Sequence, residues 1–160
     1  STAFGRAVLD FLRGDRSNEG TGRQFRKRGH VLGDIVGSSV WYAGQPKSGF
    51  TGDAYAAFAA IPRAPMVYVG ANDGMLHAFN ASTGKEAFAY VPEGLYGTAA
   101  APNLNRLSEA GYTHRYYVDG SPFVADIYMG PKSPARTTDE KYGAHSKLRP
   151  ISSRTTVSST

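Results

Sequence analysis

The sequence predicts a mainly β protein built around a four-stranded antiparallel unit with short helical insertions. From residue 31 onward the apolar residues lose helical spacing and fall into short runs broken by glycine. Residues 66–91 contain three such runs separated by two turn signals. The chain also has 19 glycines, 10 tyrosines and 8 phenylalanines, a composition that suits strands and turns better than a helical bundle.

Charge and pattern divide the 160 residues into three parts. Residues 1–30 predict a short helix and a basic linker, with a net charge of +4. Residues 31–128 hold the strand patterning and carry −3. Residues 129–160 carry +4 and show no alternation of apolar residues, so we expect a disordered tail that buries too little apolar surface to offset its ordering entropy. A shifted reading frame, a divergent terminus and added sequence are open explanations for this tail.

The first segment predicts an amphipathic helix, because its apolar residues recur at helical spacing within residues 3–13. Gly14 then stands where a left-handed C-terminal cap belongs, and residues 15–22 are expected to be loop. The tripeptide Arg13-Gly14-Asp15 matches the integrin-recognition sequence, which presents one cation and one carboxylate on an exposed loop. These three residues are candidate receptor-binding residues, and a purely structural helix cap is the alternative.

A first strand is predicted at residues 35–43, followed by a loop at 45–52. Residues 53–61 are rich in alanine and begin with Asp53, a residue type that favours the N-cap position. We therefore expect a second helix there, which Pro62 ends.

The most informative stretch has three β-type runs at residues 66–70, 75–79 and 86–91. The turns between them contain glycine and small polar residues that tolerate positive φ, as tight hairpins require. These runs predict an antiparallel meander, and with residues 35–43 they give four successive strands, the unit of a propeller blade. The residues assigned to the blade turns are Asn72, Asp73, Gly74, Thr83 and Gly84.

A later segment, residues 119–124, repeats the Gly-Ser-apolar order of residues 36–41 and predicts the first strand of a second blade. Two insertions separate these segments, at residues 45–65 and 92–114, and the second has the composition for a short helix. The fold expected is therefore a partial β-propeller, with about one four-stranded antiparallel blade plus the start of the next. Because a propeller closes with four to eight blades, the isolated chain is expected to be marginally stable or self-associating.

Five motifs follow one another along the chain: Phe11-Leu12-Arg13-Gly14-Asp15, Val31-Leu32-Gly33-Asp34-Ile35, Tyr55-Ala56-Ala57-Phe58, the run from Tyr68 to Phe79, and Val118-Asp119-Gly120-Ser121-Pro122. Residues 67–88, with Ala78, Thr83, Gly84 and an aromatic residue at 88, resemble the repeat of quinoprotein-type propellers. The wider set of motifs resembles the PilC/PilY family of type IV pilus biogenesis and tip adhesin proteins. The resemblance implies a binding and structural module that supports pilus assembly, surface attachment and twitching motility. It also implies export through the periplasm to the outer cell surface, with minor pilins and a host-cell receptor as partners.

Two positions depart from the quinoprotein repeat, which usually has Asp and Trp where this chain has Asn80 and Phe88. The alternative function is a fragment of a pyrroloquinoline quinone-dependent dehydrogenase propeller. The departures, the insertions and the run from Tyr68 to Phe79 favour the pilus module over that enzyme.

The resemblance also implies possible calcium dependence, but residues 72–74 and 119–121 offer at most two oxygen side chains each, fewer than a calcium loop presents. We expect no cofactor in this segment and calcium, if any, elsewhere in a full-length protein.

Several functions are not indicated by the residues. The chain has no cysteine, no Gly-x-Ser-x-Gly elbow and no zinc signature, and His77 and His114 are interpreted as structural, so no catalytic residue is assigned. The patterned centre is acidic rather than basic, which argues against nucleic-acid binding. No apolar run approaches the roughly 20 residues that cross a bilayer, so no membrane insertion is expected.

Overall fold

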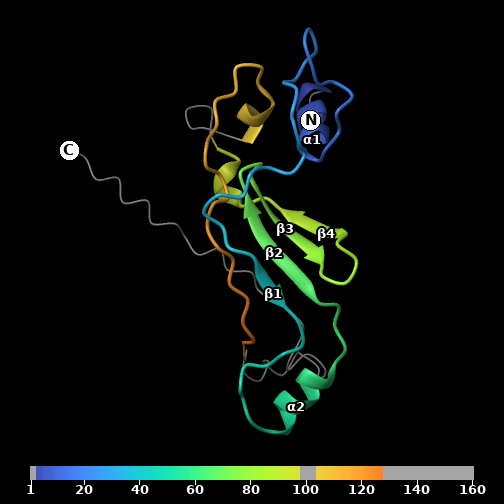
Figure 1. Ribbon diagram of the computed structural model, residues 1–160, viewed down its shortest axis with the longest axis vertical. Coiled ribbons are helices and arrows are strands. Elements are labelled where there is room, and N and C mark those ends of the chain that lie inside the picture. Colours follow the sequence, from blue (N-terminus) through green and yellow to red (C-terminus); the bar gives the residue numbers. More distant parts are fainter. Residues whose placement is uncertain (1–2, 98–103, 128–160) are drawn as a thin grey trace, which may run out of the picture.

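The computed structural model describes residues 3–97 and 104–127. A four-stranded sheet forms the middle of the molecule, with helix α1 at one end and helix α2 at the other (Figure 1). The elements, in chain order, are α1 (Ala3–Leu12), β1 (Trp41–Ala43), α2 (Asp53–Ala60), β2 (Met66–Ala71), β3 (Met75–Asn80), β4 (Glu86–Tyr90) and two 3₁₀-helices, η1 (Glu93–Leu95) and η2 (Leu104–Ser108).

Residues 3–30, which we call the N-terminal lobe, have a small apolar core of their own. Val8 and Phe11 on the buried face of α1 pack against Phe25, and the ring centroids of Phe11 and Phe25 are 5.0 Å apart. A helix of 10 residues is marginal by itself, so this packing is what holds α1 in place.

The end of α1 confirms the predicted cap. Gly14 has φ +109°, and its N–H donates to the carbonyl of Phe11, while the N–H of Asp15 donates to the carbonyl of Asp10. This pair of bonds is the Schellman arrangement, which needs a residue that tolerates positive φ at the position of Gly14.

The sheet confirms the predicted meander. Its strand order is β1-β2-β3-β4, and every neighbouring pair is antiparallel. The best-buried residues lie at its centre, where Ala78 of β3 is fully buried and Tyr68 and Val69 of β2 are nearly so. In contrast, β4 is exposed along its whole length. The sheet is not closed, and the fold is mainly β, consistent with a partial propeller.

Both predicted hairpin turns are present. In the first, Gly74 has φ +90° and donates its N–H to the carbonyl of Ala71. In the second, Gly84 has φ +68° and donates to the carbonyl of Asn80, whose side-chain oxygen also accepts the N–H groups of Ser82 and Thr83. The amide of Asn80 therefore makes the local turn bonds that aspartate would make in its place.

The first strand is shorter than predicted. Residues 35–43 were expected to be extended, but β1 holds only Trp41–Ala43. One reason is that the side chain of Ser38 competes with the backbone ladder. Its hydroxyl accepts the N–H of Gly70 at 2.8 Å, so a hydroxyl rather than a main-chain carbonyl is the partner of β2 at this point.

The prediction of a strand at residues 119–124 is wrong, because this segment has no strand hydrogen bonding. Side chains of this segment instead accept backbone N–H groups of the segment before β1. The N–H of Gly37 donates to Asp119 Oδ1 at 2.7 Å, and the N–H of Ser39 donates to Ser121 Oγ at 2.9 Å. The two similar Gly-Ser segments thus lie side by side, joined by side-chain to backbone bonds.

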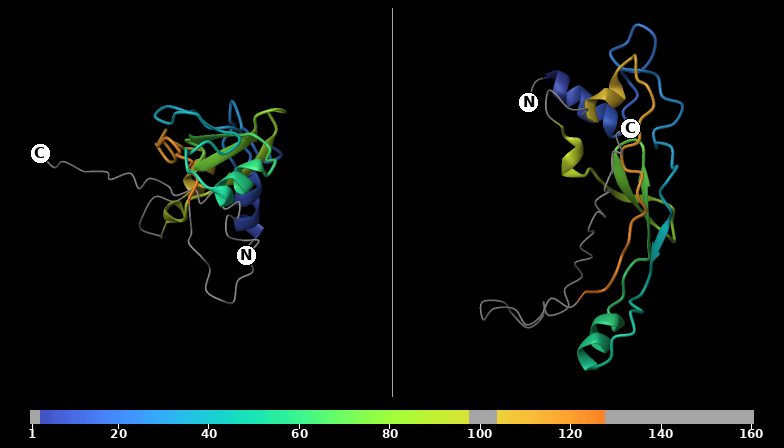
Figure 2. Two further views of the ribbon diagram at one scale, coloured as in Figure 1. Left: turned by 90° about the horizontal axis from the view of Figure 1, so that it is seen from below. Right: turned by 90° about the vertical axis from the view of Figure 1, so that its left-hand side faces the viewer.

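Helix α2 ends one residue before the predicted boundary and begins differently from the prediction. Gly52, with φ +110°, occupies the N-cap position and no side chain caps the helix, so Asp53 is the first helical residue instead of the cap. A carboxylate in the first turn still interacts favourably with the helix dipole. The helix projects from the sheet at the end opposite the N-terminal lobe (Figure 2).

The second insertion contains the expected short helix, which is the 3₁₀-helix η2. Leu104 and Leu107 of this helix are buried. No helix in the two described ranges has the length and apolar character to cross a bilayer. The predicted tail, residues 129–160, lies outside the described residues.

A substitution at Gly33 tests how tightly the chain packs against the first hairpin turn. A Cβ at this position would lie 2.2 Å from the backbone nitrogen of Asp73, whereas a Cβ on Gly29 would meet nothing within 4 Å. We expect Gly33→Ala to lower the free energy of unfolding by about 1–3 kcal/mol, because backbone atoms must shift. Gly29→Ala is the matched control. Equal thermal midpoints for the two variants would contradict this packing.

Candidate functional site

Three distant segments meet at the turn between β2 and β3. Asn72, which is 2% exposed, connects two of them to the sheet. Its backbone N–H and its side-chain amide both donate to Asp34, at 3.0 Å each, and its side-chain oxygen accepts the N–H of Tyr117 at 3.1 Å. We call the polar residues around this turn the turn hub, which consists of Asp34, Asn72, Asp73, His77, Glu86 and His114.

Asp73 adds a second set of bonds to the turn hub. Its Oδ2 accepts the N–H of Gly33 at 2.8 Å, and its Oδ1 accepts the N–H of Met75 at 3.1 Å. The same carboxylate lies 3.0 Å from Nε2 of His77. One side chain therefore closes the turn, holds the segment before β1 and orients a buried histidine.

His77 lies between two carboxylates. Its Nδ1 is 2.6 Å from Glu86 Oε1, and its Nε2 faces Asp73. Burial of the ring lowers the pKa of His77, but the hydrogen bonds to Asp73 and Glu86 outweigh that effect, so the pKa is raised overall. With both ring nitrogens facing carboxylates, the charged imidazolium is the form that can donate to both. His77 thus connects the β2–β3 turn to β4 through its two ring nitrogens.

His114 also belongs to the turn hub. Its Nε2 is 2.8 Å from Asp34 Oδ2, and its ring packs edge-on against Tyr116. The hydrogen bond from Asn72 lowers the pKa of Asp34, and the bond to His114 adds to this shift. Asp34 is therefore favoured as a carboxylate that has hydrogen-bond partners on two segments.

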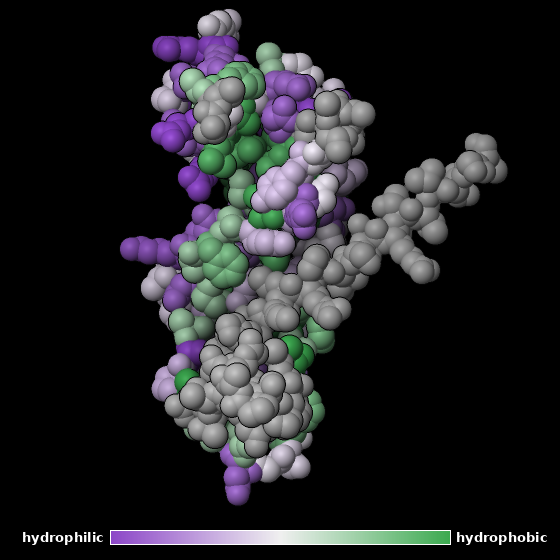
Figure 3. Space-filling model, turned by 180° about the vertical axis from the view of Figure 1, so that it is seen from behind, coloured by the Kyte–Doolittle hydropathy of each residue, from purple (hydrophilic) through white to green (hydrophobic). Residues whose placement is uncertain are grey.

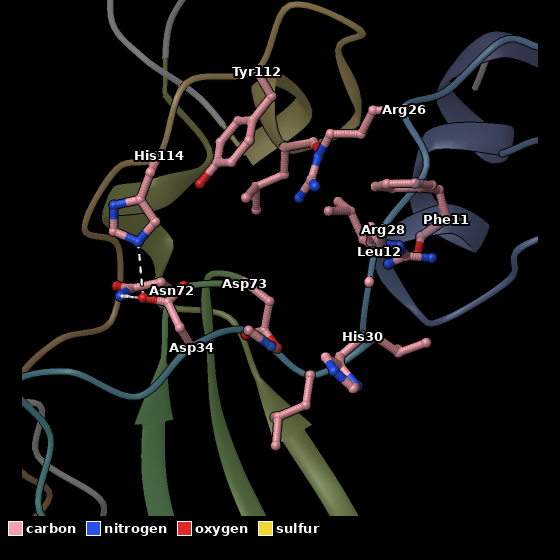
Figure 4. A pocket seen from close by; sticks show the side chains of 15 residues that line it. Phe11, Leu12, Arg26, Arg28, His30, Asp34, Asn72, Asp73, Tyr112 and His114 are labelled. Carbon is pink, nitrogen blue, oxygen red and sulfur yellow. Dashed lines mark hydrogen bonds and ion pairs between the residues drawn. The ribbon is translucent and has the colours of Figure 1, made fainter. Parts of the chain in front are cut away.

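A pocket of about 340 Å³ lies between the N-terminal lobe and the turn hub (Figure 4). Arg26 and Tyr112 lie along one side, and Asp34 and Asp73 lie on the other (Figure 4). Its apolar lining comes mainly from the lobe and from the segment that follows it, with Phe11, Leu12, Val31, Leu32 and Leu107.

The candidate receptor residues Arg13, Gly14 and Asp15 follow the end of α1, and Arg13 lines a cavity together with residues of β3 and β4. The side chains of Arg13 and Asp15 are exposed. The carboxylate of Asp15 accepts bonds from the backbone N–H and hydroxyl of Ser17, and these bonds lower the pKa of Asp15. Its backbone carbonyl accepts Nη2 of Arg28. The backbone of the tripeptide is therefore held by the helix cap and by the bond to Arg28.

At the two acidic turns, the described carboxylates already have hydrogen-bond partners. Asp73 already accepts backbone bonds and faces His77, and Asp119 accepts the N–H of Gly37. Within residues 3–97 and 104–127 no group of three acidic or histidine side chains is arranged to hold a metal ion. Calcium elsewhere in a full-length protein remains a prediction.

Sequence reasoning missed two features of this site. It found no carboxylate partner for His77, although Glu86 and Asp73 both contact it. The hairpin pairing of β3 with β4 was a usable signal, because it brings Glu86 close to the face that carries His77. Nothing in the sequence spacing connected Asp34 to Asn72, which lie 38 positions apart.

His77 makes the stability of the sheet dependent on pH. Because its pKa is raised on folding, the stabilisation is fully present below the ordinary imidazole value of about 6.5 and is lost as pH rises through the raised pKa. We expect the thermal midpoint to fall between pH 6 and pH 8.5, and His77→Gln to flatten this dependence. The control His30→Gln changes an exposed histidine and keeps the pH step. A His77→Gln profile parallel to that of the wild type would refute the assignment.

Comparisons with known proteins agree with this architecture. The family described as PilY1 beta-propeller domain matches residues 32–134. No solved structure matches the chain.

Curated relatives carry the same family name. A protein of Xylella fastidiosa named "Type IV pilus biogenesis factor PilY1 homolog" is 52% identical, with 75% of this chain and 10% of the relative covered. The "Type IV pilus biogenesis factor PilY1" of Pseudomonas aeruginosa strain PAK is 42% identical, with 79% of this chain and 11% of the relative covered. The chain spans about a tenth of the length of these relatives. The family match covers more than half of the chain and the relatives agree with it, so the chain belongs to the PilY1 β-propeller domain family.

Proposed function

We propose that this chain is a propeller segment of a type IV pilus biogenesis factor that acts as a tip-associated adhesin, and that it supports pilus assembly and surface attachment. The observation that carries this proposal is the four-stranded antiparallel sheet within the part that matches the PilY1 propeller family. The role is structural and binding rather than enzymatic. Its location is the outer surface of the cell, in association with the pilus.

The architecture supports a display role. The sheet positions two insertions at its ends, one carrying the projecting helix α2 and one carrying η2 beside the N-terminal lobe (Figure 1). Insertions of this kind are where binding surfaces concentrate, because a rigid scaffold fixes them while their sequence varies. Minor pilins and a host-cell receptor are the proposed partners.

The quinone dehydrogenase alternative is not favoured. The matched relatives are named for pilus biogenesis, and His77 and His114 bond to carboxylates that belong to the turn hub.

Gly70 offers a test of the assembly role in the full-length protein. A Cβ on Gly70 would lie 2.5 Å from the carbonyl oxygen of Val118, whereas one on Gly94 would meet nothing within 4 Å. We expect Gly70→Ala to reduce surface pili several-fold, measured by electron microscopy and by pilin in the sheared fraction. Gly94→Ala is the matched control. Normal piliation after deletion of residues 66–91 would overturn the assembly role.

Receptor binding through Arg13, Gly14 and Asp15 is a part of the adhesin proposal that can be tested separately. We expect Asp15→Glu to reduce attachment to host cells several-fold, because the longer side chain displaces the carboxylate relative to Arg13. Ser17→Ala is the control, since it removes a bond to Asp15 and keeps the carboxylate. Unchanged attachment by a folded Asp15→Glu protein would remove the tripeptide from the proposal and leave the pilus role standing.

A further inference from the structure

Arg26 is fixed at the side of the pocket by contacts to the second insertion. Its backbone N–H donates to the carbonyl of Ser108 at 3.1 Å, and its side-chain Nε donates to the carbonyl of Leu107 at 2.5 Å. The guanidinium carbon lies 4.3 Å from the ring centroid of Tyr112. These contacts restrain the long side chain, so little further rotamer freedom is lost when its remaining N–H groups bind a partner.

The neighbouring Arg28, in contrast, has a hydrogen-bond partner at each of its three side-chain nitrogens. Its Nε pairs with Glu19 at 2.5 Å, and its two terminal nitrogens donate to the carbonyls of Phe11 and Asp15. Arg26 has no such arrangement. Among the residues of the described ranges no carboxylate lies within ion-pair distance of it, and its terminal nitrogens point into the pocket (Figure 4).

The acids across the pocket do not fill this role. Asp34 is held by Asn72 and His114, and Asp73 is held by backbone N–H groups and His77. Partial burial lowers the pKa of Arg26, which is the sign expected for a cation that has lost part of its hydration.

We propose that this pocket binds the carboxylate of an acidic side chain from a protein partner, with the terminal N–H groups of Arg26 as the paired donors. The planar guanidinium matches a carboxylate in bidentate geometry. The apolar lining, with Leu12, Val31 and Leu32, suits the methylene groups of glutamate and an apolar neighbour in the partner segment.

Two further observations favour an acidic protein segment. The first 30 residues carry seven Lys/Arg against three Asp/Glu, so the field around the lobe attracts negative charge. The upper part of the molecule, where the lobe lies, shows apolar surface beside hydrophilic surface (Figure 3). A dianionic phosphate fits less well, because its second charge would face Asp34 and Asp73 across the same pocket.

The inference rests on the contacts of Arg26 and on the lining of the pocket, so it does not depend on the pilus role. A protein that failed to support pilus assembly could still bind the acidic segment, and the reverse also holds.

Arginine modification in the unaltered full-length protein provides a test. Phenylglyoxal labels accessible guanidinium groups, and mass spectrometry measures the rate at each arginine. The probe is the blocked peptide acetyl-Ala-Leu-Glu-Leu-Ala-amide, and its control has glutamine in place of glutamate. We expect the glutamate peptide to slow labelling of Arg26 at least five-fold and to leave the exposed Arg23 unchanged, while the glutamine peptide protects neither.

Three other outcomes would contradict part or all of the proposal. Equal protection of Arg26 by acetate at the same concentration would overturn the assignment to a protein segment, and protection by phosphate alone would overturn the carboxylate. If neither peptide nor small anion protected Arg26, the site itself would be excluded.

Variants give a second measurement by fluorescence anisotropy of the labelled glutamate peptide. We expect Arg26→Gln to weaken binding about ten-fold, in line with loss of a charged hydrogen-bonded pair. Arg23→Gln is the matched control, because it removes a nearby exposed cation that does not line the pocket. Equal affinity of the Arg26→Gln and Arg23→Gln proteins would contradict the proposal.

Discussion

The bonds of Asn72 at the β2–β3 turn are the constraint on which the rest of the structure depends. This buried amide accepts from Tyr117 and donates to Asp34, so it joins the segment before β1 and the segment after η2 to one turn. Asp73 reinforces the same junction through Gly33 and His77. A buried polar group left without its partner is destabilising, so loss of one segment would also weaken the hold on the other.

The sequence predicted best those parts of the fold that depend on neighbours along the chain. The meander, its two glycine turns and the cap at Gly14 were all anticipated, because each depends on local φ preferences and short-range bonds. The first strand was overestimated because Ser38 bonds through its hydroxyl to Gly70, and a propensity argument does not include such competition. Residues 119–124 do not form the predicted strand for a similar reason, since the side chains of Asp119 and Ser121 accept backbone N–H groups.

The site was less predictable than the fold. Asp73 was assigned as a turn residue, and the structure adds that it holds Gly33 and orients His77. The sequence does not distinguish Arg26 as a binding residue, because it stands among several basic residues in a polar segment. Its distinction from Arg28 is purely three-dimensional: Glu19 pairs with one and not the other, and only the fold decides which.

The contact between Arg26 and Ser108 has a consequence for how the chain folds. The hairpins of the meander close short loops and can form early, whereas this contact joins positions separated by more than 80 residues. During synthesis the N-terminal lobe leaves the ribosome long before its docking surface on η2 exists. Its apolar face, which includes Leu12 beside the pocket, therefore stays uncovered until the second insertion reaches it.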